Sequence, residues 1–378
     1  MTLHHEVEGP AGAPVLVLLG TIGSTLHSWD AVTGSLAEDL RVVQVDTRGH
    51  GGSAPVRSDR PPSIADLGAD VLDLLDHLAA PRVHLAGVSL GGMTAMWLAV
   101  HHPDRIGRLA LLGTSAYLPP AQVWRDRAAL VLADGMAAVA AAAAARWITT
   151  CLAKRDPELM AWLTSMLLGA DPEDYAWCCG AIAAMDLRAD LPRIAAATLV
   201  VVGAEDPATP VPHAETIAAG IHGARLEVVP DAAHVAPVEQ PGVVAALLGE
   251  HFGADRLAAG MRTRREVLGD AHVDRALAAA TELTAPFQDF ITRYAWGEVW
   301  TEDTLSRRER SVATLAALVA LGAEGELALH VRAALRNGMS EQEIGAVLRH
   351  TAVYAGVPRV NSALALAQRV LDEERTGG

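Results

Sequence analysis

Short apolar runs alternate with helical patterns through roughly the first 115 residues. Val15-Leu-Val-Leu-Leu19 is a continuous apolar run of the kind that is buried on both faces of a parallel sheet, and Arg41 to Asp46 and Arg108 to Leu112 are also expected as strands. Ile64 to Leu78 instead carries apolar residues at helical spacing, with Ser63 placed as its N-cap. This alternation predicts a mostly parallel α/β sheet with crossover helices.

The pattern changes between about residues 116 and 191, where no strand is evident and Ala-, Leu- and Trp-rich helices dominate. Apolar strands resume at Thr198 to Gly203 and at Leu226 to Val229, and a helix from about Pro241 to Phe252 follows. We therefore expect a helical cap, inserted between two strands, over the active edge of the sheet.

The stretch from Gly253 to Arg265 is charged and contains Gly and Ala, which indicates a linker. Every later segment has a helical pattern, with breaks at turn or cap residues. The expected helices are Asp270 to Leu283, Pro286 to Val299, Ser306 to Leu321, Glu324 to Asn337, Glu341 to Tyr354 and Asn361 to Glu374. The sequence thus predicts an α/β domain at residues 1–254, with its cap at about 116–191, and an all-α domain at residues 266–378.

Length and charge narrow the possibilities. A chain of 378 residues exceeds the size at which one core usually stops growing, which favours two domains. The formal net charge of −15 argues against nucleic acid or an anionic membrane as a partner, so local Arg or His must attract any anionic substrate. The three cysteines, Cys151, Cys178 and Cys179, imply no disulfide framework and indicate a reducing, cytoplasmic setting. We expect a soluble protein without a targeting segment.

The segment around Ser89 carries the first candidate chemistry. An apolar run from Val83 meets Gly87-Val-Ser-Leu-Gly91 and continues into a helical pattern, which is the strand, sharp turn and helix of a nucleophile elbow. A serine at the tip of so tight a turn tolerates only small residues at the two flanking positions, and Gly87 and Gly91 supply them. Ser89 is the candidate nucleophile.

An acid, a base and an oxyanion hole follow in the order that this fold requires. Asp206 comes after a strand and is the candidate acid, with the adjacent Glu205 as the alternative. His234 lies on the loop after the next strand and is the candidate base. The backbone N–H groups of Leu90 and Ile22 are the expected oxyanion donors.

Residues 1 to about 252 resemble the α/β-hydrolase fold. The strings Asp46-Thr-Arg-Gly-His-Gly51, Val88-Ser-Leu-Gly-Gly-Met93 and Asp231-Ala-Ala-His-Val-Ala-Pro237 are similar to 3-oxoadipate enol-lactonases in particular. The first string is shared with esterases and cofactor-free haloperoxidases, so it defines the superfamily better than the substrate. Gly20-Thr21 departs from the His-Gly or Ser-Asn of many relatives.

The helical tail, about residues 256 to 378, resembles carboxymuconolactone decarboxylases. The matching strings are Leu305-Ser-Arg-Arg-Glu-Arg310, Gly325-Glu-Leu-Ala-Leu-His330 and Val353-Tyr-Ala-Gly-Val-Pro358. The redox branch of this superfamily needs a Cys-x-x-Cys motif, and the tail contains no cysteine, which excludes thiol peroxidase chemistry. The resemblance implies catalysis by Glu326 and His330, four residues apart on one helix face, with Arg308 as a carboxylate clamp. The alternative to a catalytic role is that Glu326 and His330 form an ordinary ion pair on the surface.

Together the two resemblances imply a bifunctional enzyme of aromatic catabolism that needs neither cofactor nor metal. The tail would decarboxylate 4-carboxymuconolactone, and the first domain would hydrolyse the resulting enol-lactone to 3-oxoadipate. Two alternatives remain open: an esterase or lactonase of other specificity whose tail only forms oligomers, and a haloperoxidase-like enzyme. The expected partners are small lactone di-acids and further copies of the same chain, assembled through the tail.

Overall fold

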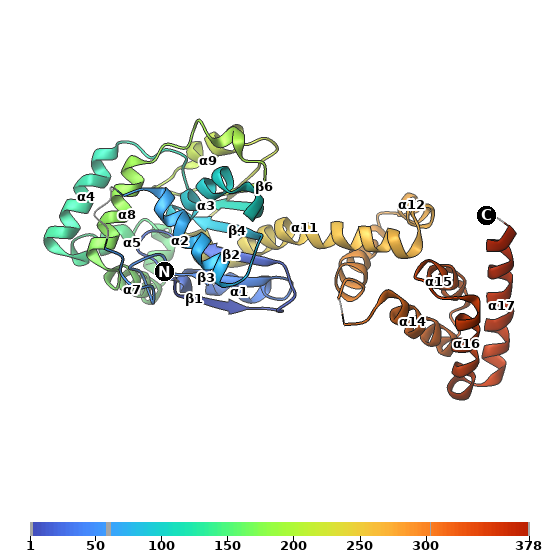
Figure 1. Ribbon diagram of the computed structural model, residues 1–378. Helices are drawn as coiled ribbons and strands as arrows, with labels where there is room; N and C mark the ends of the chain where they lie inside the picture. The colour runs from blue at the N-terminus through green and yellow to red at the C-terminus, as the bar shows by residue number, and fades with distance from the viewer. Residues whose placement is uncertain (1–2, 58–61, 303, 377–378) are drawn as a thin grey trace. The chain divides into compact units, whose positions relative to one another are not determined.

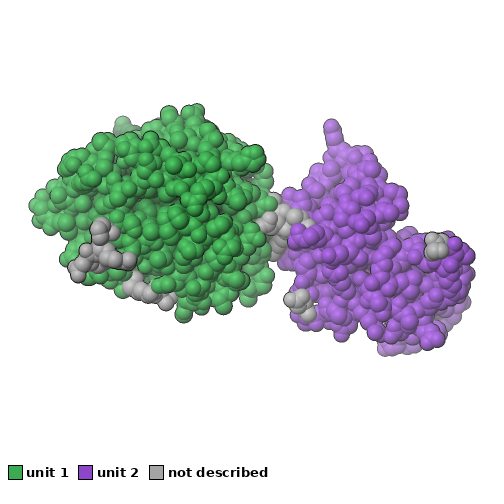
Figure 2. Space-filling model, turned by 45° about the horizontal axis from the view of Figure 1, so that its top comes forward, with its two compact units in different colours: residues 1–253 green, residues 254–378 purple. Residues whose placement is uncertain are grey.

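The computed structural model describes residues 3–57, 62–302 and 304–376. It divides into two compact units, Met1–Gly253 and Ala254–Gly378, which Figure 2 distinguishes by colour. Each unit is described by itself below. Within the described ranges, no helix combines the length and the apolar character needed to cross a membrane.

The first unit is built on a twisted sheet that is parallel except at one edge (Figure 1). The described residues contribute seven strands in the order β1-β3-β2-β4-β5-β6-β7, of which only β1 pairs antiparallel, with β3. The strands are β1 (His5–Glu8), β2 (Val15–Leu19), β3 (Arg41–Val45), β4 (Val83–Val88), β5 (Ile106–Leu112), β6 (Ala197–Gly203) and β7 (Arg225–Val229). The predicted α/β class is confirmed, although the short and largely exposed β1 has no apolar pattern that would have indicated it.

Both faces of the sheet are buried, which explains the continuous apolar runs. In β2, Leu16 and Leu18 belong to one hydrophobic cluster, whereas Val17 and Leu19 belong to the other. Successive side chains of a strand point to opposite faces, so a strand covered on both sides must be apolar throughout. The helices outside the cap are α1 (Asp30–Leu36), α2 (Ile64–His77), α3 (Leu90–His101), α9 (Val211–Gly220), α10 (Ala236–Glu239) and α11 (Pro241–Leu268).

A helical cap occupies the chain between β5 and β6. Its helices are α4 (Ala121–Asp134), α5 (Ala140–Ala144), α6 (Thr150–Arg155), α7 (Pro157–Leu168) and α8 (Pro172–Ala184), which cluster together in Figure 1. Asp156 and Asp171 cap α7 and α8 by accepting hydrogen bonds from backbone N–H groups of the first turn, and a proline follows each of them.

The stretch from Gly253 to Arg265, expected as a linker, is helical, because α11 continues through it to Leu268, and the division between the two units falls at its start. Gly260 has a packing role in this helix. A Cβ at this position would overlap the carbonyl of Thr292, so the glycine permits the close approach of a neighbouring segment within the second unit and does not end the helix.

The second unit is helical throughout its described residues. After α11 come α12 (Asp270–Ala278), α13 (Ala285–Ile291), the π-helical segment η5 (Thr292–Val299), α14 (Arg307–Leu321), α15 (Glu324–Arg336), α16 (Glu341–Ala355) and α17 (Val357–Thr376). Ser306 and Ser340 form capping boxes with Glu309 and Glu343 at the starts of α14 and α16.

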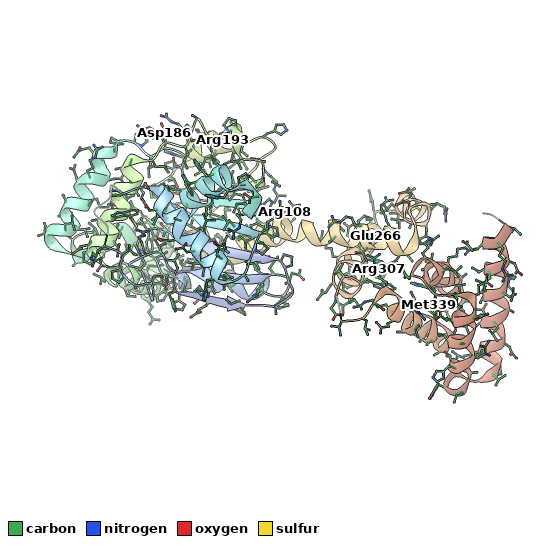
Figure 3. The ribbon with its side chains drawn as sticks, viewed as in Figure 1. Arg108, Asp186, Arg193, Glu266, Arg307 and Met339 are labelled. Carbon is green, nitrogen blue, oxygen red and sulfur yellow. The ribbon has the colours of Figure 1, made fainter. Side chains whose placement is uncertain are left out.

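The last four helices of the second unit share one hydrophobic core. Leu315, Val331, Ile344, Leu348 and Val360 are buried in it, one or two from each helix. Met339, labelled in Figure 3, joins the same cluster. Figure 3 also shows Glu266 of α11 and Arg307 of α14, whose side chains form an ion pair between the two helices. The predicted all-α class of this region is confirmed.

Candidate active sites

Ser89 lies at the tip of the turn between β4 and α3. Its φ of +55° is rare for a residue with a side chain, and such strain is characteristic of nucleophile elbows. The neighbouring chain holds the turn in place, since the Ser89 N–H donates to the Leu112 carbonyl at 3.0 Å and the Thr114 hydroxyl donates to the Ser89 carbonyl at 2.6 Å.

The two flanking glycines are sterically required, as the spacing predicted. A Cβ on Gly87 would overlap the backbone of Gly91, and a Cβ on Gly91 would overlap the carbonyl of Leu19 in β2. The elbow therefore packs against itself and against the neighbouring strand at distances that only glycine permits.

The two expected oxyanion donors lie on either side of this turn. Leu90 is the first residue of α3, and both Ile22 and Ser89 line the same cavity. The Gly91 N–H donates to the Gly20 carbonyl at 3.1 Å, which ties the elbow to the loop that carries Ile22. Within the described residues, the backbone N–H groups of Leu90 and Ile22 donate to no protein acceptor, so both are available to a developing oxyanion.

Asp206 and His234 come together at the ends of β6 and β7. His234 Nδ1 lies 2.8 Å from Asp206 Oδ2, and both side chains are buried. Thr209 donates to the same carboxylate from its N–H and its hydroxyl, at 2.9 and 2.8 Å. Burial acts to raise the pKa of Asp206, but the charge and hydrogen bond of His234, with the bonds from Thr209, lower it from 3.8 to about 2.

An ionised carboxylate can only accept hydrogen bonds, so the proton in this pair belongs to His234 Nδ1. Nε2 is then left as the basic nitrogen of the ring. The competing acid, Glu205, has an exposed side chain and stands outside the pair. Gly113 permits the close packing here, because a Cβ on it would lie 2.6 Å from the His234 carbonyl oxygen.

Ser89 and His234 both line a cavity of about 740 Å³, including its open mouth, between the sheet edge and the cap. No hydrogen bond joins the Ser89 hydroxyl to the His234 ring among the described residues, and such catalytic bonds often shorten only when substrate is present. The cap supplies most of the walls, namely Leu118, Pro119, Pro120, Val123, Trp124, Arg127, Ala143, Arg146, Trp147 and Tyr175.

The loop that bears His234 is attached to the cap at two points. The Val235 N–H donates to the Trp147 carbonyl at 2.8 Å. The Glu239 carboxylate accepts from the N–H groups of Thr149 and Ala233, at 3.0 and 2.8 Å. The position of the base therefore depends on the cap as well as on the sheet.

The second expected site lies on α15. Glu326 is exposed and His330 is half-buried, one helical turn apart. Burial lowers the pKa of His330 below its ordinary value of 6.5; Glu326 acts to raise it and His272 to lower it. His330 is therefore mostly neutral at neutral pH, and it must take up a proton before it can give one to a substrate carbon.

Of two residues that the sequence did not single out, His272 lies near this pair and Arg264 lies near His272. His272 on α12 has its pKa lowered, first by burial and then by the charges of Arg275 and Arg264, while Glu326 opposes the shift. Arg264 on α11 is 5% exposed and donates to Thr292 Oγ1 at 3.1 Å and to Gln288 Oε1 at 2.8 Å. Its buried Nε has no partner among the described residues. No motif marks either residue, since only the packing of α11 and α12 brings them to α15.

Arg308, the expected carboxylate clamp, is paired with a carboxylate of the chain itself. Its guanidinium donates to Glu343 at the start of α16, and about half of its side chain is exposed. Nothing among the described residues links Arg308 to Glu326 or His330.

The described part of the chain holds no cluster of three or more His, Cys, Asp or Glu side chains that could bind a metal ion.

The comparisons with known proteins assign different families to the two units. Residues 14–155 match the alpha/beta hydrolase fold family, and residues 285–369 match the carboxymuconolactone decarboxylase family. A 3-oxoadipate enol-lactonase of Acinetobacter baylyi is 38% identical over 242 residues, which are 64% of this chain and 89% of the relative. A 4-carboxymuconolactone decarboxylase of the same organism is 43% identical over 114 residues, which are 30% of this chain and 85% of the relative.

The chain joins a member of the α/β hydrolase family to a member of the carboxymuconolactone decarboxylase family.

A solved structure supports the first assignment. The enol-lactonase from Burkholderia xenovorans LB400 superimposes with a TM-score of 0.64 at 35% identity, covering 66% of this chain and 96% of that one. The hydrolase unit therefore spans nearly the whole of this relative, and the decarboxylase-family unit is additional to it.

The string from Asp46 to Gly51 has a structural use in the hydrolase unit. The Asp46 carboxylate accepts from the Leu26 N–H at 2.6 Å and the Gly52 N–H at 2.8 Å, which orders two loops at the sheet edge. Arg48 pairs with Asp70 at 2.6 Å, and its guanidinium lies 4.6 Å from the ring centre of Trp177 in the cap. These contacts support the scaffold of the site, which agrees with the sharing of this string by enzymes of different specificity.

Proposed function

We propose that this chain catalyses two consecutive reactions. The decarboxylase-family unit converts 4-carboxymuconolactone to 3-oxoadipate enol-lactone, and the hydrolase unit opens that lactone to 3-oxoadipate. The observation that carries the proposal is the union, in one chain, of a unit similar to an enol-lactonase and a unit similar to a carboxymuconolactone decarboxylase. The enol-lactone produced by the decarboxylation is the substrate of the hydrolysis.

In the hydrolase unit, the Ser89 hydroxyl attacks the lactone carbonyl while His234 Nε2 takes its proton. Asp206 keeps the imidazole in the required tautomer and stabilises the imidazolium. The N–H groups of Leu90 and Ile22 donate to the oxyanion of the tetrahedral intermediate. Collapse of the intermediate breaks the ring C–O bond, and His234 returns the proton as the enol leaves and becomes the ketone. Water, activated by His234, then hydrolyses the ester on Ser89.

In the decarboxylase-family unit, CO2 leaves the ring carbon beside the lactone oxygen. The electron pair enters the ring double bond and reaches the lactone carbonyl, so the substrate is its own electron sink and the proposal requires no cofactor. A proton then returns to the carbon next to the carbonyl. We assign this proton transfer to His330, oriented by Glu326, and assign binding of the anionic substrate to the buried cation Arg264 in place of Arg308.

The proposal includes a homo-oligomer formed through the second unit. Phe287, Phe290 and Tyr294 follow one another along α13 and η5, with 57%, 59% and 54% of their surfaces exposed. Phe290 stacks on both neighbours, with ring centres 6.4 and 5.9 Å apart. An exposed apolar stripe of this kind is typical of a surface that another protein covers.

We also place the protein in the cytoplasm, because Cys151, Cys178 and Cys179 are free thiols.

One observation favours a second candidate, in which the tail is not catalytic. A cavity of about 570 Å³ in the second unit is lined by Leu318, Leu327, Arg359 and their neighbours, and includes neither Glu326 nor His330. The experiment that separates the two candidates supplies 4-carboxymuconolactone to the whole protein. The proposal requires CO2 and 3-oxoadipate in equal amounts, whereas an esterase with an oligomerising tail would release no CO2.

A further inference from the structure

Two arginines line the cavity that contains Ser89. Arg127 lies on α4 and Arg146 lies between α5 and Trp147, and both side chains are half-buried. The cavity-lining residues include no Asp or Glu, and no carboxylate lies within ion-pair distance of either guanidinium among the described residues. The cavity thus carries local positive charge, although the formal net charge of the whole chain is −15.

Placing these two guanidinium groups together is electrostatically unfavourable when no anion is bound. Burial lowers the pKa of Arg146 from its ordinary value and the like charge of Arg127 lowers it further, while Tyr175 and the Asp206 carboxylate act to raise it without cancelling the shift. Arg127 is held over the ring of Trp124, with 5.0 Å between its Cζ and the ring centre. Two neighbouring guanidinium groups repel each other, and a bound anion would relieve that repulsion.

A buried neutral donor lines the same cavity. Tyr175 is fully buried, and its hydroxyl makes no hydrogen bond of standard geometry among the described residues, although the Arg127 guanidinium lies close enough to lower its pKa. Burial raises the pKa of Tyr175 to about 12, so the hydroxyl keeps its proton at neutral pH. Buried polar groups are normally paired, so an unpaired donor beside two cations indicates an acceptor that the chain does not supply.

We propose that Arg127 and Arg146, assisted by the Tyr175 hydroxyl, bind a carboxylate carried by the substrate, so that the hydrolase unit selects anionic lactones and esters over neutral ones. This inference rests on the proposed function only for the role of Ser89 as the nucleophile. Guanidinium groups suit the task because they form paired, charge-assisted hydrogen bonds with carboxylate oxygens. The apolar walls, including Trp124, Trp147 and Leu118, would hold the rest of a small ring or chain.

The test compares two esters that differ only in charge. The mono-4-nitrophenyl ester of succinic acid carries a free carboxylate, and its methyl-capped counterpart carries none. The quantity measured is the ratio of kcat/KM for the charged ester to that for the capped ester. We expect a ratio above about 10 for the wild type, because a hydrogen bond to a charged group typically changes binding by a factor of about 10 to 100.

Arg146→Met and Arg127→Met should each lower this ratio by about 10- to 100-fold, with Arg146→Lys retaining part of it. Tyr175→Phe, which keeps the ring, should lower it by a smaller factor. The matched control is Arg125→Met on the same helix, since Arg125 is exposed and does not line the cavity. Its ratio should equal that of the wild type.

A wild-type ratio of 1 or below, or a ratio that neither Met variant changes, would overturn the inference. Measuring enol-lactone hydrolysis with the same proteins separates the two proposals. Enol-lactone hydrolysis with an unchanged ratio in both variants refutes carboxylate binding alone. A ratio that falls as expected, without any hydrolysis of the enol-lactone, supports carboxylate binding and refutes the proposed substrate.

Discussion

His234 Nδ1 lies 2.8 Å from Asp206 Oδ2, and the same carboxylate accepts two further hydrogen bonds from Thr209. The bonds from Thr209 therefore hold the Asp206 carboxylate in the position from which it orients His234. Glu205, one residue earlier, is exposed and has no such neighbours. The two candidate acids thus differ in their surroundings, because only Asp206 is buried and hydrogen-bonded. The sequence alone, in which they are adjacent, does not distinguish them.

The first prediction compares these two acids. Asp206→Asn should lower kcat for lactone hydrolysis by about 10⁴, because the amide stabilises the wrong tautomer of His234. Glu205→Gln is the matched control and should change kcat by less than about threefold, since surface substitutions have small effects. Steady-state hydrolysis of the enol-lactone measures both variants. The reverse ranking would make Glu205 the acid.

The second prediction concerns stability and pH. The pKa of Asp206 is lowered to about 2, so its ionised form stabilises the folded state above about pH 4, and this contribution is lost as the pH falls through 2. A shift of this size corresponds to about 2 kcal/mol at neutral pH. Asp206→Asn should therefore unfold at a lower temperature than the wild type at pH 7, with the difference narrowing below pH 4. Calorimetry of both proteins at pH 7 and pH 3 gives the comparison, and a difference independent of pH would contradict the assignment.

The third prediction tests the packing of the elbow. Gly91→Ala places a methyl group against the Leu19 carbonyl, and this overlap should destabilise the hydrolase unit by about 1–3 kcal/mol or more and reduce lactone hydrolysis strongly. Gly242→Ala is the control, because its Cβ would meet no atom within 4 Å in helix α11. That variant should be as stable as the wild type or more stable, by up to about 1 kcal/mol. Equal thermal stability of the two variants would show that the glycine is not sterically required.

The fourth prediction concerns the second site. His330→Gln should abolish CO2 release from 4-carboxymuconolactone while leaving hydrolysis of added enol-lactone intact, because the two sites belong to different units. In the wild type, turnover should rise as the pH falls from 8 to 6, because only the imidazolium form of His330 can return a proton to the substrate carbon and its lowered pKa makes that form scarce at neutral pH. Arg332→Gln, a half-buried residue on the same helix that pairs with Glu373 and Glu374, is the control. Normal CO2 release by the His330 variant would show that Glu326 and His330 form a surface pair without a catalytic role.

Much of the fold could be predicted because strands buried on both faces must be apolar and helix ends carry recognisable caps. The elbow was visible for a similar reason, since Gly87 and Gly91 are demanded by local geometry. The acid and base followed from their order along the chain.

What the sequence did not provide depends on contacts between distant segments. Gly260 was interpreted as part of a linker, although it permits the close approach of Thr292 to α11. Arg127 and Arg146 face one cavity only because the cap folds over Ser89, and no spacing between them indicates it. His272 approaches His330, and Arg264 approaches His272, through the packing of helices, and Arg308 is paired with Glu343 for the same kind of reason.

The central claim is that one chain carries two separate active sites that act in succession, and the Ser89→Ala variant tests it most directly. Supplied with 4-carboxymuconolactone, this variant should release CO2 at the wild-type rate and accumulate one equivalent of enol-lactone, with almost no 3-oxoadipate, once slow spontaneous hydrolysis is subtracted. Following CO2, the enol-lactone and 3-oxoadipate over one time course measures all three quantities. Release of 3-oxoadipate at the wild-type rate, or loss of CO2 release together with hydrolysis, would contradict the account.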